Sequence, residues 1–164
     1  MAGTYERQKA VAYANRWWND YHPAFPRFTV DCTNYVSQCL FAGGIKMAGY
    51  PDRQKGWWCT FNKWSLSWSV SHSFYWHVKE TQHSMPVTEV ATAEELYVGD
   101  VICYDFQGDS RWDHTTIVVG KDSEGFPLVN AHTDNSYHRS WVYSDSMAWT
   151  PDIHYAFFHI GNEH

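Results

Sequence analysis

The sequence predicts an α+β fold in which N-terminal helices pack on an antiparallel β-sheet. Helical periodicity is confined to the N-terminal half of the chain, and β-branched runs separated by turn residues fill most of the C-terminal half. Helices followed by consecutive strands are typical of an α+β domain, whereas alternating strands and helices would indicate a parallel sheet. With 164 residues and no internal repeat or linker-like segment, the chain is expected to form a single domain over residues 1–164.

Three helical segments are predicted in the N-terminal half. Residues 4–21, 31–42 and 68–80 place apolar side chains at helical spacing. Residues 43–63 are rich in glycine and are expected to form a long loop, a feature that is usually functional inside a compact domain. Residues 81–93 are polar and are expected to contain a turn. Five strands are then predicted, at residues 101–105, 115–120, 126–132, 141–143 and 153–160.

The helix of residues 31–42 carries the most distinctive pattern. Asp31 occupies the N-cap position and Gly43-Gly44 the C-cap position. Cys32 therefore lies in the first turn, where unpaired N–H groups and the helix dipole favour a thiolate and can stabilise an oxyanion. This is the arrangement of a papain-like nucleophile, although many cysteines at helix starts simply pack in a core. The apolar face of the helix comprises Cys32, Tyr35, Val36, Cys39 and Leu40.

A thiol nucleophile needs a base, and the base needs a group that orients it. His114 begins a predicted strand, and Asn130 and His132 lie two residues apart on the next one, so their side chains share a face. If the sheet packs on the start of the cysteine helix, Cys32, His114 and His132 can form a triad, with Asn130 as the alternative third member. The simpler interpretations are that His114 is a solvent-exposed histidine at a strand end and that His132 is a hydrogen-bonded residue in a turn.

Composition excludes several other classes. The formal net charge of −6 argues against a binder of nucleic acid or anionic membranes, and no apolar window reaches the length of a membrane span. The four cysteines form no C-x-x-C pair, so we expect no metal and no cofactor. Asp105, Asp109 and Asp113 form an acidic loop that resembles a solvated turn more than a calcium site.

Residues 31–38, Asp-Cys-Thr-Asn-Tyr-Val-Ser-Gln, carry a resemblance to a known family. They resemble the D-C-T-N-F-x-S-Q signature of the putative amidase domain family, which is allied to the NlpC/P60 and CHAP groups of papain-like cysteine hydrolases. Further matches follow in the expected order and cover nearly the whole chain. They include Tyr5-Glu6-Arg7, Ala42-Gly43-Gly44, Trp57-Trp58, Trp68, Gly99-Asp100-Val101-Ile102, His114-Thr115-Thr116-Ile117-Val118 and Ala131-His132-Thr133.

The resemblance implies a papain-like, NlpC/P60-type α+β fold with Cys32 as nucleophile and His114 as general base. It places the third polar group on the following strand, where His132 is the better match and Asn130 the second. Tyr21 is the nearest equivalent of a tyrosine that lines the site in related enzymes. The other candidate substrate-binding residues are Asp31 and the aromatic pair Trp57 and Trp58, in a segment suited to a glycopeptide groove.

Relatives of this type cut bacterial cell-wall peptidoglycan, which makes peptidoglycan the expected partner of a monomeric enzyme. We expect an N-acetylmuramoyl-L-alanine amidase; an endopeptidase of the stem or cross-bridge is the first alternative. A non-wall amidase or deamidase and a non-catalytic wall-binding module are the other two. The chain begins without a recognisable signal peptide, so a phage lysin and an excised module of a secreted hydrolase both fit an extracellular, wall-associated protein.

Overall fold

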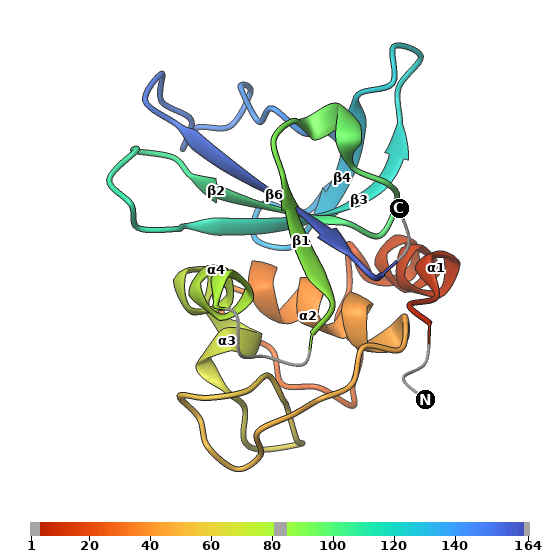
Figure 1. Cartoon of the computed structure of the whole chain (residues 1–164), viewed down its shortest axis with the longest axis vertical. Coiled ribbons are helices and arrows are strands. Elements are labelled where there is room, and N and C mark those ends of the chain that lie inside the picture. The colour runs from red at the N-terminus through yellow and green to blue at the C-terminus, as the bar shows by residue number, and fades with distance from the viewer. Residues whose placement is uncertain (1–3, 81–84, 163–164) are drawn as a thin grey trace.

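A computed structural model describes residues 4–80 and 85–162 of the chain. In this part of the protein, helices lie against one face of a six-stranded antiparallel sheet (Figure 1). The helices are α1 (Arg7–Trp17), α2 (Cys32–Ala42), α3 (Leu66–Ser69) and α4 (Ser71–Lys79). The strands are β1 (Val87–Val90), β2 (Val101–Asp105), β3 (His114–Lys121), β4 (Pro127–Ala131), β5 (Ser136–Ser140) and β6 (His154–Ile160), with a short 3₁₀ helix η1 at Ala93–Glu95.

The strand order is β1-β6-β2-β3-β4-β5, with every neighbouring pair antiparallel. This arrangement confirms the predicted α+β class and the predicted order of helices before strands. β2 has the predicted bounds. β3 is one residue longer than predicted at each end, β4 is one residue shorter at each end, and β6 begins one residue later. These strands were predictable because they are apolar, β-branched and bounded by turn residues. No helix in residues 4–80 or 85–162 is long and apolar enough to cross a membrane.

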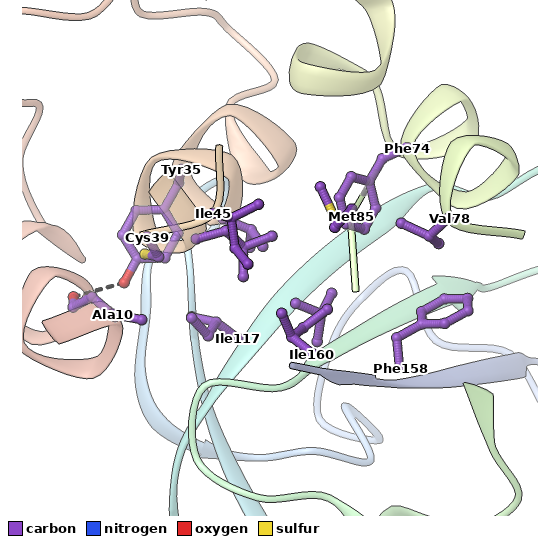
Figure 2. Packing of buried hydrophobic residues seen from close by; sticks show 14 of the residues in the cluster. Ala10, Tyr35, Cys39, Ile45, Phe74, Val78, Met85, Ile117, Phe158 and Ile160 are labelled. Atoms are coloured by element: carbon purple, nitrogen blue, oxygen red, sulfur yellow. Dashed lines mark hydrogen bonds between the residues drawn. The ribbon is translucent and has the colours of Figure 1, made fainter. Parts of the chain in front are cut away.

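α2 lies at the centre of the helical layer. Tyr35, Cys39 and Leu40 are fully buried, and the Tyr35 hydroxyl donates to the Ala14 carbonyl of α1 at 2.6 Å (Figure 2). The helix ends as predicted: the Ile45 N–H donates to the Leu40 carbonyl while Gly44 adopts a φ of +100°, as in a Schellman motif. This packing holds the first turn of α2 against the sheet.

The two faces of the sheet bury different residues because side chains alternate along each strand. Odd-numbered residues of β2 and β3 such as Cys103 and Ile117 pack against the helices. Even-numbered residues such as Tyr104 and Val118 form a second cluster with Leu96, Val129, Tyr143 and Phe157 on the opposite face. On β3, odd-numbered side chains therefore face the helices and even-numbered side chains face the second cluster. His114 is one of the even-numbered residues.

Several predicted boundaries were wrong. The first helix begins at Arg7 with Glu6 at its N-cap position, and it ends at Trp17. The predicted helix of residues 68–80 is interrupted at Val70, whose extended ψ of 126° separates α3 from α4. Residues 81–84 of the predicted polar segment lie outside the described residues, but β1 follows them and pairs with β6.

The predicted strand at residues 141–143 is a turn, and the edge strand β5 precedes it. Tyr143 has a φ of +61°, which an extended strand cannot accommodate. β5 has the sequence Ser-Tyr-His-Arg-Ser and is largely exposed, so it lacks the apolar alternation by which a half-buried strand is recognised. The apolar residues that suggested a strand instead cover the second hydrophobic cluster.

Candidate active site

Cys32 is the first residue of α2 and is held in place by contacts on both sides of it in the sequence. The Asp31 N–H donates to Thr133 Oγ1 at 2.9 Å, and Thr33 Oγ1 lies 3.0 Å from Thr115 Oγ1. Thr115 adjoins His114, and Thr133 lines a pocket together with His114. The helix start therefore contacts the same end of the sheet that carries the histidine.

The Cys32 sulfur lies in a cluster of hydroxyl groups. Its Sγ atom is 3.5 Å from Ser71 Oγ and 3.8 Å from Thr33 Oγ1. Ser71 Oγ in turn is 2.7 Å from Thr33 Oγ1 and 2.9 Å from Thr115 Oγ1. Hydroxyl donors and the unpaired N–H groups of the first turn can both stabilise negative charge on the sulfur. Sequence reasoning missed Ser71 and Thr115 because they belong to α4 and β3, which only the tertiary structure brings to α2.

His114 forms a hydrogen bond to a tyrosine. Its Nε2 atom is 3.0 Å from the Tyr143 hydroxyl, which donates to Ser136 Oγ at 3.3 Å. Ser136 Oγ donates to the Asp134 carbonyl at 2.9 Å. A carbonyl only accepts, so the protons along this chain all point toward Asp134. His114 Nε2 therefore carries the ring proton, and Nδ1 is left with its lone pair free.

The electrostatic surroundings keep His114 neutral. Burial and, to a smaller extent, the positive charge of Arg139 lower the pKa of His114 to about 4, against the opposing effects of Asp134 and Asp113. Arg139 lies with its guanidinium carbon 3.9 Å from the centre of the Tyr143 ring. At neutral pH the imidazole is thus an unprotonated base, and Nδ1 forms no hydrogen bond with any residue that the structure describes.

Cys32 and His114 are not hydrogen-bonded to each other in this structure. The residues on either side of Cys32 are nevertheless anchored beside His114. Burial raises the pKa of Tyr143 to about 12, and the nearby Cys32 contributes a smaller increase. Catalytic hydrogen bonds are often long before substrate binds. The structure thus places the two residues at the same end of the sheet and leaves their catalytic roles as predictions.

The structure does not place His132 or Asn130 against His114. His132 Nδ1 is 2.6 Å from Asp31 Oδ2, and its Nε2 is 2.6 Å from the Trp17 carbonyl oxygen. Asn130 donates to Asn15 Oδ1 and accepts from the His138 N–H.

The reason is the register of β3 and β4. Ile117 pairs with Asn130, so Asn130, and His132 two residues further on, share the helix-facing side of the sheet, as the stacking of His132 on the Tyr35 ring confirms. His114 has the opposite parity. The polar group that adjoins the His114 ring is the Tyr143 hydroxyl, which no sequence motif marked.

The proposed substrate-binding residues lie elsewhere. Trp57 and Trp58 are each only 1% exposed, and the Trp57 indole donates to Ser37 Oγ in the core. The Asp31 carboxylate accepts hydrogen bonds from the Phe28 N–H and from Asn34 and His132. The Tyr21 ring contacts His132 edge to face. None of these four side chains lines the pockets that contain Cys32 and His114.

Two pockets meet at the candidate site. The first, of about 490 Å³, includes Cys32, Ser71, Arg53 and Arg111 in its lining. The second, of about 540 Å³, includes His114, Tyr143 and Asp134. Asp113 borders both, so the nucleophile candidate faces one pocket and the base candidate the other. A substrate that spans the two pockets would place its scissile bond between them.

The acidic loop forms a turn. The Asp105 carboxylate accepts hydrogen bonds from the Asp109 and Ser110 N–H groups. Within the described part of the chain, no three His, Cys, Asp or Glu side chains gather in a way that would hold a metal ion.

The low pKa of His114 predicts how catalysis responds to pH. If His114 is the general base, its neutral imidazole is the active form, and kcat/KM should fall on the acid side with an apparent pKa near 4, well below the ordinary histidine value. Arg139→Gln removes a positive charge that lowers this pKa, so the acid limb should move to higher pH, whereas Arg139→Lys should leave it in place. A pH–rate profile of the three proteins measures this, and an unmoved limb in Arg139→Gln would contradict the assignment.

The fold and site define an α+β domain with a cysteine at the start of a helix and a histidine at the start of a central strand. The chain belongs to the family described as "Putative amidase domain", whose family model matches residues 4–158. "Uncharacterized protein YhbB" of Bacillus subtilis (strain 168) is similar, with 52% identity over 156 residues, which cover 95% of this chain and 50% of the relative. The chain thus spans about half the length of that protein. No solved structure shows a significant match.

Proposed function

We propose that the protein is a cysteine-dependent amide hydrolase in which Cys32 is the nucleophile and His114 the general base. The family supports an amidase-type hydrolase. The observation that carries the cysteine mechanism is the neutral His114 ring, oriented by Tyr143, beside a helix that begins with Cys32. In this proposal Tyr143 takes the orienting role that the sequence assigned to His132.

In the first step, Cys32 Sγ attacks the amide carbonyl carbon while its proton passes to His114 Nδ1. The unpaired N–H groups of the first turn of α2 stabilise the oxyanion of the tetrahedral intermediate. The imidazolium then donates its proton to the leaving amine as the C–N bond breaks, which leaves a thioester on Cys32. Water, deprotonated by His114, attacks the thioester and releases the acid and the free thiol. The Tyr143–Ser136 chain keeps the Nε2 proton in place throughout.

The proposed substrate is bacterial peptidoglycan, cut at the N-acetylmuramoyl–L-alanine amide. The family description supports an amide as the bond that is cut, and the pocket beside Cys32 includes the aromatic residues Phe28, Trp64 and Trp112, which suit the face of a sugar. The setting would be the cell wall, reached by a phage lysin or by a module of a larger secreted hydrolase. A peptide bond of the stem or cross-bridge would fit the same chemistry.

Analysis of the groups released from isolated Gram-positive walls tests this proposal. A muramoyl amidase should release new N-terminal L-alanine without new reducing ends. New amino termini on other stem residues would identify an endopeptidase acting through the same residues. If no wall yields a product while Cys32 still reacts rapidly with iodoacetamide, the nucleophile stands and peptidoglycan is the wrong substrate.

A further inference from the structure

The pocket beside Cys32 contains two arginines, Arg53 and Arg111, that form no ion pair within the described part of the chain. Arg53 donates through Nε to the Trp64 carbonyl at 3.0 Å, which leaves its terminal nitrogens free. Within residues 4–80 and 85–162, neither Arg53 nor Arg111 lies within 4.0 Å of a carboxylate oxygen. One pocket is thus lined by two guanidinium groups without an ion pair, in a chain whose formal net charge is −6.

A third donor faces the same pocket. His72 lines it, and the Nδ1 atom of His72 accepts the Trp112 N–H at 3.2 Å. The remaining ring nitrogen, Nε2, therefore carries a proton and acts as a donor.

The second pocket has the opposite character. Its charged lining comprises Asp113 and Asp134, with no lysine or arginine among the lining residues. The pocket on the Cys32 side therefore has two arginines beside the shared Asp113, whereas the pocket on the His114 side has Asp113 and Asp134 and no arginine or lysine. Such an asymmetry gives a substrate one preferred direction of binding.

We infer that the pocket of Arg53 and Arg111 binds a carboxylate of the substrate next to the amide that Cys32 attacks. Guanidinium groups bind carboxylates through paired hydrogen bonds. The Phe28 and Trp64 rings, 4.8 Å apart at their centres, and Leu66 provide apolar walls for the carbon skeleton around that carboxylate. The inference rests on the proposed function and assigns it a substrate class, acidic peptides such as a stem peptide with a free glutamyl carboxylate.

Two reagents of nearly equal size test this without assuming a substrate. Iodoacetate carries a carboxylate and iodoacetamide does not, so the ratio of their alkylation rates at Cys32 reports the charge of the pocket. Arg111→Gln and Arg53→Gln should each lower the iodoacetate-to-iodoacetamide ratio by about threefold or more, and the effect should weaken in high salt. Arg16→Gln is the matched control, because Arg16 lies over the Trp17 ring on α1 and lines neither pocket. Cys32→Ala supplies the background from the other cysteines.

A binding measurement separates failure of the subsite from failure of the proposed function. Calorimetry would compare acetyl-L-alanyl-γ-D-glutamyl-L-lysine with its glutamyl α-carboxamide on the inactive Cys32→Ala protein. The acid should bind more tightly, and adding Arg111→Gln should abolish that preference. An unchanged alkylation ratio in both arginine variants, or equal binding of acid and amide, would overturn the inference. If Cys32 reacts with neither reagent, the proposed nucleophile fails, and the binding preference alone decides the subsite.

Discussion

Cys32→Ala should lose amide hydrolysis almost completely, by a factor on the order of 10⁴ or more, as expected when the nucleophile of a covalent mechanism is removed. The variant should remain folded, because the sulfur is a small part of the core and the Thr33–Ser71 and Thr33–Thr115 contacts remain. Initial rates on isolated walls or on muropeptides measure the loss, with circular dichroism to confirm the fold.

The matched control for this prediction is Cys59→Ser. Cys59 is also buried and free, but it lies in the loop of residues 43–63, where its thiol donates to the Thr60 carbonyl. Burial raises its pKa to about 12, as it raises the pKa of Cys103, so neither thiol is a ready nucleophile at neutral pH. Cys59→Ser should retain activity within about twofold. Substantial turnover by Cys32→Ala would exclude the covalent mechanism.

Asp31→Ala should strongly destabilise the folded state. Asp31 is 1% exposed, and its carboxylate accepts from the Phe28 N–H, the Asn34 amide and His132 Nδ1. Its removal leaves three buried donors without an acceptor, at about 1–3 kcal/mol for each donor and about 3 kcal/mol or more in total. We expect a loss of that size in the free energy of unfolding, measured by urea titration at pH 7. Activity should fall as well, because the start of α2 loses its anchor beside Cys32.

Asp52→Ala is the matched control for Asp31. The Asp52 carboxylate also accepts two N–H groups, those of Gln54 and Lys55, but it is exposed. Its loss should cost about 1 kcal/mol or less. A double-mutant cycle of Asp31 and His132 should show a coupling of about 1–3 kcal/mol. Additive effects would mean that the two side chains do not act as a pair.

The fold was largely predictable because its signals are local. The apolar face of α2, Asp31 at its start and the glycines at its end all lie within one short segment. β2, β3 and β6 are apolar runs of ordinary length. β5 and the turn at Tyr143 were not predictable, because an exposed edge strand carries little hydrophobic pattern and the left-handed conformation of Tyr143 depends on its packing.

The site was only partly predictable, because its geometry depends on register. The sequence placed Cys32 at a helix start and His114 at a strand start, and in the structure the two residues line neighbouring pockets that share Asp113. It could not show that His132 and His114 face opposite sides of the sheet, since that depends on the pairing of Ile117 with Asn130. Nor could it reveal Tyr143, whose contact with His114 spans 29 residues of sequence and follows from a turn.

Cooperation between Cys32 and His114 is the central claim, and the alkylation rate of Cys32 tests it most directly. The measurement compares the second-order rate constant for iodoacetamide at pH 7 in the native protein and in His114→Gln, with Cys32→Ala as background. If His114 Nδ1 accepts the thiol proton, the rate constant should fall about tenfold or more in His114→Gln. An equal rate constant in the two proteins would show that the thiol reacts without the imidazole, and would contradict the proposed cooperation.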